Sequence, residues 1–256
     1  MDPARRHGAR FTGRTAVITG AASGIGAATA ERLAQEGAAV ILADIAEERG
    51  EAVAERITED GGLARFVPAD VSAEQDWQRI VTAAHAYGPV DVLVSNAYTV
   101  DVTPAHEMSL DSWQRQLSVN LTAAFLGFRA ALPDLRSGGG AVVLTSSVHA
   151  HAGIPGHPAY AASKGALLSL CGQLAVEYGP EVRVNAVLPG PVLTAAWDRV
   201  PPKERERSVA GTAVRRFGTP AEVAAAIAFL SAEEASFITG SHLVVDGGWS
   251  VVKASA

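Results

Sequence analysis

Short apolar runs alternate with helical patterns along all 256 residues, and this alternation restricts the folds open to the chain. The apolar runs predict seven strands, at residues 15–19, 39–43, 64–69, 90–94, 141–145, 182–188 and 243–245. The helical patterns fall between them, at residues 24–37, 47–60, 73–87, 110–136, 158–178 and 220–231. Alternating strands and helices form βαβ units, and nearly all-apolar strands indicate a sheet covered on both faces. The sequence therefore predicts a Rossmann-type, doubly wound α/β fold with a mainly parallel seven-stranded sheet.

The same pattern indicates a single domain. Residues 1–13 show no periodic pattern and are expected to be a flexible lead-in. Residues 14–256 are expected to form one domain, since α/β folds of this length are often undivided. Within it, the polar and irregular residues 195–217 are expected to form a small helical lid.

Composition excludes several classes of protein. The formal net charge of -6 argues against a nucleic-acid binder, which usually carries a basic patch. No apolar run reaches the ~18 residues that a membrane span needs. The single cysteine, Cys171, cannot form a disulfide within the chain, and it is expected to be a buried structural thiol. These features favour a cytoplasmic protein whose partner is a small molecule.

A glycine-rich turn joins the first predicted strand to the first predicted helix. Backbone N–H groups of such a turn can approach a pyrophosphate closely, and the start of a helix adds unpaired donors and a partial positive charge. No Gly-Lys-Ser/Thr follows the turn, which disfavours a triphosphate-binding loop. The turn therefore predicts a dinucleotide site, with cofactor contacts from Gly20, Ser23, Gly24, Ile25 and Gly26.

A carboxylate closes the second predicted strand. Asp44 can accept hydrogen bonds from both adenosine ribose hydroxyls and would repel a 2′-phosphate. Its sequence neighbours, Ala43, Ile45 and Ala46, supply no basic group. Asp44 therefore favours NAD over NADP, although a carboxylate here can also cap the following helix.

Two further strand ends suit the same cofactor. Asp70 and Val71 close the third strand, where a carboxylate can bond the adenine amino group and Val71 can offer a backbone contact. Asn96 and Ala97 close the fourth strand beside the expected cofactor. Either pair can instead cap a helix.

A tyrosine and a lysine lie four residues apart in the helical pattern 158–178. This spacing puts Tyr160 and Lys164 on one helix face, one turn apart. A phenol with an ordinary pKa of ~10 is too weakly acidic to act as a base near neutrality. A neighbouring ammonium and an oxidised nicotinamide both favour the phenolate. The pair thus predicts a proton-transfer group, and Lys164 is also expected to contact the cofactor.

A serine closes the fifth predicted strand, 13 residues before Tyr160. Strand ends on this edge of a doubly wound sheet face the ligand crevice. The hydroxyl of Ser147 can hold the oxygen of a substrate, and Ser146 is expected to point elsewhere because strand side chains alternate.

Together these motifs resemble the short-chain dehydrogenases/reductases over residues 12–249. Residues 19–26 are similar to the family's T-G-x-x-x-G-x-G, and Ser147, Tyr160 and Lys164 are similar to its Ser…Tyr-x-x-x-Lys. Asn96-Ala97 resembles part of its N-A-G, and Asp246-Gly247-Gly248 its C-terminal signature. The resemblance implies hydride transfer between NAD and a secondary alcohol or ketone.

The resemblance also implies roles for further residues. Asn120 is similar to the helix asparagine that completes the family's catalytic tetrad and holds a water near the lysine. Pro189-Gly190, with Val192 and Thr194 after it, resembles the segment that contacts the nicotinamide carboxamide. A homotetramer or homodimer is implied, with residues 110–136 and 158–178 as dimer faces. One residue departs from the pattern, because Tyr98 stands where the family usually has glycine.

Several residues are expected near the substrate, and each also has an alternative role. Tyr98 can reshape the pocket, and His149, just past Ser147, can hydrogen-bond a sugar or polyol. His151 and His157 share this loop, and all three histidines can instead serve loop packing or an oligomer contact. Trp197 can close over the substrate or pack within the lid. No carboxylate or cysteine accompanies the histidines, so no metal site is predicted.

Three functions remain open at this point. The leading hypothesis is an NAD-dependent dehydrogenase of a sugar, polyol or other secondary alcohol. A reductase of 3-oxoacyl thioesters is the alternative within the family, but it suits NADPH and a basic docking patch. A non-catalytic NAD-binding sensor would not need Asn120, Ser147, Tyr160 and Lys164 together.

Overall fold

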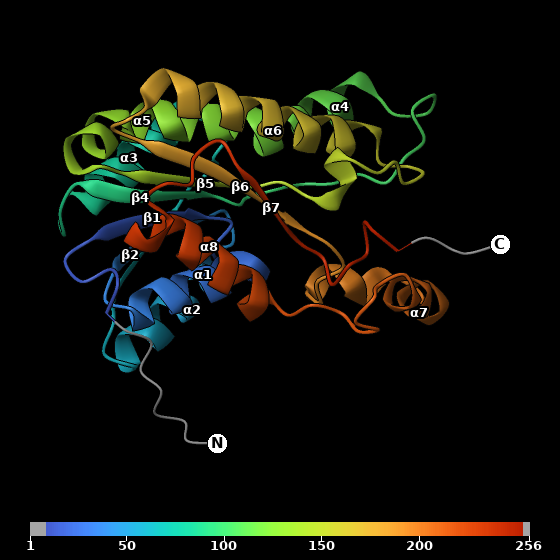
Figure 1. Ribbon diagram of the computed structural model, residues 1–256, viewed down its shortest axis with the longest axis horizontal. Helices are drawn as coiled ribbons and strands as arrows, with labels where there is room; N and C mark the ends of the chain where they lie inside the picture. Colours follow the sequence, from blue (N-terminus) through green and yellow to red (C-terminus); the bar gives the residue numbers. More distant parts are fainter. Residues whose placement is uncertain (1–8, 253–256) are drawn as a thin grey trace.

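A seven-stranded sheet forms the centre of the protein (Figure 1). The computed structural model describes residues 9–252. The sheet order is β3-β2-β1-β4-β5-β6-β7, and every neighbouring pair runs parallel. The strands are β1 (Thr15–Thr19), β2 (Ala39–Asp44), β3 (Leu63–Pro68), β4 (Val90–Ser95), β5 (Ala141–Thr145), β6 (Arg183–Pro189) and β7 (His242–Val245). The predicted doubly wound sheet is confirmed, and its order reverses between β1 and β4, where such folds bind ligands.

Two layers of helices cover the sheet. One layer holds α1 (Gly24–Gln35), α2 (Glu47–Glu59) and α8 (Pro220–Ser231), and the other holds α3 (Glu74–Ala84), α4 (Leu110–Leu117), α5 (Ala123–Gly138) and α6 (Pro158–Tyr178). Each layer closes a separate hydrophobic core against one face of the strands. Trp77 is fully enclosed in one core and Leu33 in the other. The strands are apolar on both faces because both faces are buried.

The helix expected over residues 110–136 contains an irregular turn. Between α4 and α5, residues Ser118–Thr122 form a π-helical turn, η1. A π turn adds one residue to a helical turn and is often found at functional sites. The hydrophobic pattern continues through it, so the sequence shows only one long helix.

The N-terminal boundary differs from the sequence prediction. Of the expected lead-in, residues 1–8 lie outside the described residues, but Phe11 is buried in the core. The Phe11 N–H donates to the main-chain oxygen of Glu36, and Arg10 forms an ion pair with the Glu36 carboxylate. The core therefore begins before the expected boundary at residue 14.

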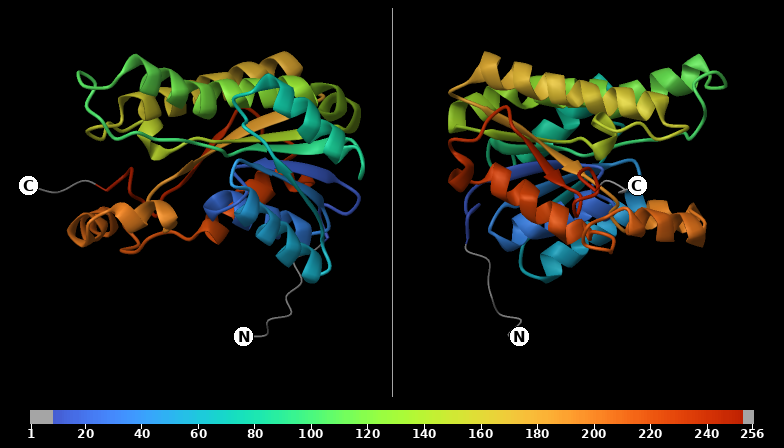
Figure 2. Two further views of the ribbon diagram at one scale, coloured as in Figure 1. Left: turned by 180° about the vertical axis from the view of Figure 1, so that it is seen from behind. Right: turned by 45° about the vertical axis from the view of Figure 1, so that its right-hand side comes forward.

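The segment that was expected to form a lid, residues 195–217, lies between β6 and α8. It contains the short 3₁₀ helix η3 (Ala195–Arg199) and α7 (Pro202–Ala210). Trp197 packs edge-on against Phe217, with ring centroids 4.6 Å apart. In both ribbon figures α7 protrudes at the same end of the molecule as the loop that precedes α4 (Figure 2). Within the described residues, none of the helices combines the length and apolar character that a bilayer crossing requires.

Candidate active site

The turn between β1 and α1 requires glycine at three positions, Gly20, Gly24 and Gly26. Gly20 and Gly24 have φ angles of 65° and 55°, in the left-handed region that side chains disfavour. A Cβ on Gly20 would lie 2.8 Å from the Ala97 Cα, and one on Gly26 would lie 2.1 Å from the Gly20 carbonyl oxygen. The turn is thus packed directly against the end of β4 and the start of α1.

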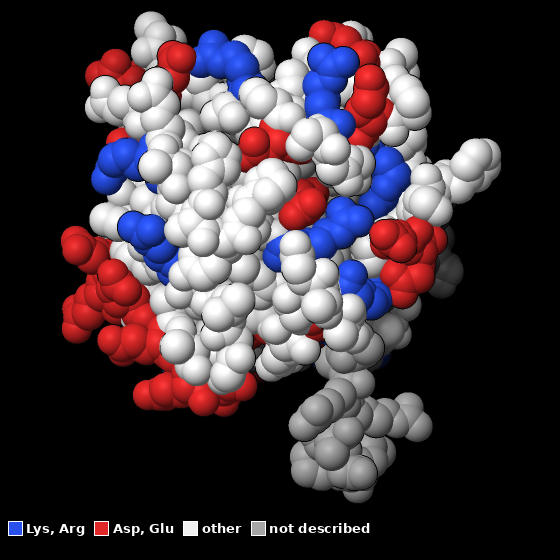
Figure 3. All heavy atoms as spheres, turned by 90° about the vertical axis from the view of Figure 1, so that its left-hand side faces the viewer, with Lys and Arg blue, Asp and Glu red and all other residues white. Residues whose placement is uncertain are grey.

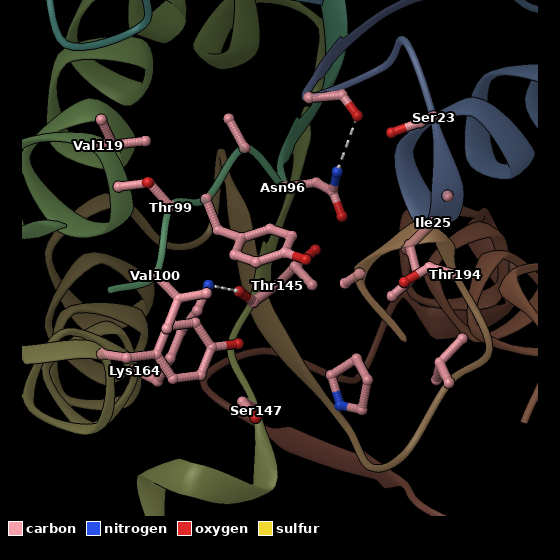
Figure 4. A pocket seen from close by; sticks show the side chains of 18 of the residues that line it. Ser23, Ile25, Asn96, Thr99, Val100, Val119, Thr145, Ser147, Lys164 and Thr194 are labelled. Atoms are coloured by element: carbon pink, nitrogen blue, oxygen red, sulfur yellow. Dashed lines mark hydrogen bonds between the residues drawn. The ribbon is translucent and has the colours of Figure 1, made fainter. Parts of the chain in front are cut away.

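Asn96 clamps this turn to β4. Its Nδ2 donates to the Gly20 carbonyl oxygen at 3.3 Å (Figure 4) and to the Thr19 carbonyl oxygen at 3.0 Å, and its main-chain N–H donates to Thr19 Oγ1 at 2.9 Å. The Ala97 N–H shares the same hydroxyl at 3.0 Å. Asn96 and Ala97 therefore hold the predicted dinucleotide turn in shape, besides bordering the cavity that it faces.

Asp44 is fixed at the rim of the same turn. Its Oδ2 accepts the Ala22 N–H at 3.1 Å and its Oδ1 accepts the Ala46 N–H at 3.0 Å. Ala46, not Asp44, directly precedes the first residue of α2. The exposed side chain of Arg49, one helical turn further on, lines the same cavity. Arg49 lies five residues after Asp44, so the immediate sequence neighbours of Asp44 did not indicate this cation.

Asp70 makes an ion pair that the sequence did not indicate. Arg115, on α4, donates to Asp70 Oδ2 at 3.2 Å, and Ser72 donates to Oδ1 at 2.6 Å. Partial burial acts to raise the pKa of Asp70, but the bonds from Ser72 and Arg115 outweigh it and hold the pKa below its usual value. Asp70, Val71 and Arg115 all line the cavity.

Lys164 is almost completely enclosed, with 2% of its surface exposed. Its Nζ donates to the main-chain oxygen of Thr145, at the end of β5, at 2.8 Å (Figure 4). The same nitrogen lies 5.4 Å from the ring centroid of Tyr160, one turn earlier on α6. Burial lowers the pKa of Lys164 to about 7.

The acidity of Tyr160 differs from the sequence expectation. Burial raises the pKa of its phenol, a hydrogen bond from Ser147 acts against this, and the nearby Tyr98 adds to the increase. Among the chain's own groups, desolvation therefore outweighs the predicted help from the Lys164 ammonium. The positive charge of an oxidised nicotinamide would act in the opposite direction.

Ser147 stands at the end of β5, where it caps the 3₁₀ helix η2 (Val148–Ala150). Its Oγ accepts the His149 N–H at 3.2 Å. Ser146 points away, as predicted, and its hydroxyl donates to the Lys164 carbonyl oxygen at 2.7 Å. Alternation at the strand end thus directs the Ser146 hydroxyl to the α6 main chain and leaves the Ser147 hydroxyl free of that contact.

Asn120 lies in the π turn and ties three elements together. Its Oδ1 accepts the Thr99 N–H at 2.7 Å, and its Nδ2 donates to the Thr99 carbonyl oxygen at 2.9 Å. The Nδ2 also lies 3.2 Å from Ser163 Oγ on α6. The side-chain amide thus fixes the loop after β4 against α6.

The segment after β6 closes the opposite side of the site. A Cβ on Gly190 would lie 2.6 Å from the Asp246 Cβ, so Pro189-Gly190 and the Asp246-Gly247-Gly248 signature are packed together. Thr194 reaches the glycine-rich turn, since a Cβ on Gly24 would lie 3.3 Å from its Cγ2. Figure 4 shows Ser23, Ile25 and Thr194 facing the same space as Ser147 and Lys164.

A cavity of about 640 Å³ runs along the carboxyl ends of the strands. This volume is within the range of ligand pockets. Gly26 and Asn120 do not line it, because they support the turn and the loop from behind. It is bordered by the other residues predicted from sequence: Gly20, Ser23, Gly24, Ile25, Asp44, Asp70, Val71, Asn96, Ala97, Tyr98, Ser147, His149, Tyr160, Lys164, Pro189, Gly190, Val192, Thr194 and Trp197. The tight glycine turn, the helix start behind it and the fixed carboxylate of Asp44 together fit a dinucleotide.

Comparison with known proteins gives consistent matches. A family model described as enoyl-(acyl carrier protein) reductase matches residues 20–250. Glucose 1-dehydrogenase 2 of Bacillus subtilis (strain 168) is 40% identical over 249 residues, covering 94% of this chain and 96% of the relative. The 2,5-dichloro-2,5-cyclohexadiene-1,4-diol dehydrogenase LinX of Sphingobium indicum is 37% identical over 245 residues, covering 94% and 98%. The crystal structure of gox2181 is 31% identical, with a TM-score of 0.91 and coverage of 95% and 98%.

Proposed function

This chain belongs to the short-chain dehydrogenase/reductase family, and on that premise we propose that it is an NAD-dependent dehydrogenase of a cyclic secondary alcohol. The reaction class follows from the relatives, which are dehydrogenases that act on CH–OH groups. The observation that carries the proposal for this chain is the convergence of Ser147, Tyr160 and Lys164 on the cavity that the glycine-rich turn borders.

In the proposed mechanism, the chain's residues hold and move one proton. The Ser147 hydroxyl holds the substrate oxygen, and Tyr160 Oη takes the hydroxyl proton in oxidation or returns it in reduction. A bound nicotinamide supplies the redox partner, and its oxidised ring supplies a positive charge that favours the phenolate. Lys164 adds its ammonium beside Tyr160, and Asn120 positions the loop that faces them. The positions of these groups in a buried cleft support this assignment.

NAD is the proposed cofactor because Asp44 presents a fixed carboxylate at the expected adenosine ribose. A 2′-phosphate would meet this charge at close range. Arg49, on the same cavity wall, offers a counter-charge and limits how strongly the site rejects NADP. We therefore propose a preference for NAD, not an absolute requirement.

Reduction of a 3-oxoacyl thioester is the second candidate, and the matching family model, described as enoyl-(acyl carrier protein) reductase, is named for another reduction of a carrier-bound thioester. An acidic carrier protein would need a basic docking surface. On the face in Figure 3, Lys and Arg lie scattered among Asp and Glu, and the largest patch of one sign is acidic. Figure 3 views the end of the molecule away from α7 and the cavity, so the charge of the whole chain is the better guide: its formal net charge of -6 and Asp44 both favour the alcohol dehydrogenase.

We further propose a homotetramer or homodimer in which α5 and α6 meet their copies. Phe125 and Val176, on these helices, expose 45% and 84% of their surface, and large exposed apolar side chains commonly mark interfaces. We also propose one catalytic domain with residues 195–217 as its lid, and a cytoplasmic location. Cys171 is buried, which raises the pKa of its thiol to about 12 and suits a structural role.

A substrate panel tests the proposal most simply. Purified protein is given NAD or NADP with cyclohexanol, cyclohexanediols and glucose, and in the reverse direction NADH or NADPH with acetoacetyl and crotonyl thioesters. Nicotinamide absorbance follows turnover. The proposal expects NAD-linked oxidation of a cyclic alcohol. Turnover of a thioester alone would support the second candidate.

A further inference from the structure

His149 lies against the proposed proton-transfer residue. Its ring is perpendicular to that of Tyr160, with centroids 5.2 Å apart. On another side it packs on His157, whose ring centroid is 5.0 Å away. The main-chain N–H of His149 donates to Ser147 Oγ. Thus one residue touches both groups proposed to hold the substrate oxygen, and its side chain lines the cavity.

The imidazole of His149 has unused hydrogen-bonding capacity. Its Nδ1 is enclosed and has no hydrogen-bond partner among the residues that the structure describes. His157 does not supply one, because its own Nδ1 bonds the Pro155 carbonyl oxygen at 2.8 Å. An unpaired polar atom in a buried place carries a free-energy cost that an apolar ring would avoid. Ring packing alone therefore does not explain a histidine at this position.

The chemistry of the imidazole defines the kind of group that can pair with it. Burial, with the charges of His157 and Lys164, lowers the pKa of His149 to about 4, so the ring is neutral near pH 7. A neutral imidazole has one donor and one acceptor nitrogen, and either can face a ligand. A hydroxyl group can bond whichever nitrogen faces it, because a hydroxyl both donates and accepts hydrogen bonds. A carboxylate accepts only, and a neutral ring offers it no opposite charge.

We infer that His149 is a specificity-determining residue that binds a second hydroxyl of the substrate, which is therefore a cyclic diol or a sugar. This inference rests on the proposed function, since it takes Tyr160 and Ser147 to hold the first hydroxyl. Tyr98, edge-on to Tyr160 with centroids 6.1 Å apart, adds an apolar ring to the same wall. Together the side chains of His149 and Tyr98 suit a ring that presents one apolar side and more than one hydroxyl.

The test compares kcat/KM for cyclohexanol with kcat/KM for the 1,2-, 1,3- and 1,4-cyclohexanediols, with NAD. His149→Phe keeps a packed ring and removes both nitrogens, and His149→Gln restores a donor and an acceptor. His151→Phe is the matched control, because His151 is exposed on the same loop and does not line the cavity. NAD affinity, measured by titration calorimetry, checks that each variant is folded.

The wild-type chain is expected to favour one diol over cyclohexanol, and His149→Phe is expected to reduce this ratio about tenfold, the effect of one lost hydrogen bond. His149→Gln should recover part of it, and His151→Phe should keep the wild-type ratio. If His149→Phe keeps the wild-type ratio, because kcat/KM is unchanged or falls equally for both substrates, the inference is overturned. The proposed dehydrogenase function would not be affected by that result. Preference for a hydroxycyclohexanecarboxylate that is lost in His149→Phe would overturn the assignment of a hydroxyl. No oxidation of any alcohol by the wild-type chain would contradict the proposed function itself.

Discussion

The Nζ of Lys164 lies 2.8 Å from the main-chain oxygen of Thr145, so the buried ammonium ties α6 to the end of β5. This contact fixes Lys164 beside Tyr160 and leaves the β5 strand end open to the cavity. It also gives the lysine a partner that does not carry a full negative charge. Burial therefore remains the dominant influence on its protonation.

That burial predicts a pH dependence of stability. The pKa of Lys164 falls from 10.5 to about 7 in the folded chain. Between these values the unfolded chain binds a proton that the folded chain lacks, so the free energy of unfolding rises with pH. Urea unfolding of the wild-type chain should show this rise from pH 7 to 9.5, and Lys164→Met should show a smaller one. Equal slopes in both proteins would contradict the burial of a titrating lysine.

The glycine-rich turn should not accept a side chain at Gly26. The added Cβ of Gly26→Ala meets the Gly20 carbonyl oxygen at 2.1 Å and the Asn96 Nδ2 at 2.7 Å. We expect a loss of about 3 kcal/mol in stability, at the upper end for overpacking. NAD affinity should also fall, because the Asn96 side chain that holds the turn in shape must move.

Gly153→Ala is the control for this substitution, because nothing lies within 4 Å of the position of its added Cβ. Thermal unfolding and calorimetric titration with NAD measure both effects. Wild-type stability in Gly26→Ala would show that the turn has more room than the structure gives it.

Cofactor preference should reverse when the fixed carboxylate is removed. Asp44→Ala with Ile45→Arg removes the repulsion of a 2′-phosphate and adds a cation beside it. Hydrogen bonds to charged groups contribute about 1.5–3 kcal/mol, which corresponds to a change on the order of 10- to 100-fold in the NADP/NAD ratio of kcat/KM. An unchanged ratio would show that Asp44 does not discriminate.

Arg49 gives an independent test at the same place. Arg49→Ala, in the otherwise wild-type chain, should lower kcat/KM with NADP about tenfold or less and affect NAD far less, since only NADP offers the guanidinium a phosphate. Equal losses of kcat/KM with NAD and NADP would instead indicate that Arg49 contacts a part of the molecule common to both cofactors.

Local patterns predicted the sheet, the turn and the Tyr160–Lys164 pair because each depends on residues close together in sequence. The strand ends also converge as expected, since parallel strands place their carboxyl ends on one edge. Asn120 is different: its partners Thr99 and Ser163 lie 21 and 43 residues away in the chain. No local pattern predicts these contacts or the π turn that carries Asn120.

Other features depended on three-dimensional packing. Arg115 reaches Asp70 from a helix 45 residues later, and Arg49 borders the same cavity as Asp44 although it is not adjacent to it in sequence. The desolvation of Tyr160 follows from the surrounding core, and a motif of two residues cannot show it. Phe11 falls within the lead-in expected from sequence, because a single aromatic residue shows no periodicity, yet it packs in the core.

Proton transfer by the phenol of Tyr160 is the central step of the proposed mechanism, and Tyr160→Phe isolates it by removing one oxygen. With NAD and the best alcohol of the panel, kcat should fall about 10²- to 10⁴-fold, the contribution of a positioned acid–base group. The Kd for NAD, measured on the same preparation by calorimetry, should change little. Near-normal kcat in Tyr160→Phe, with NAD bound as in the wild-type chain, would contradict the proposed mechanism.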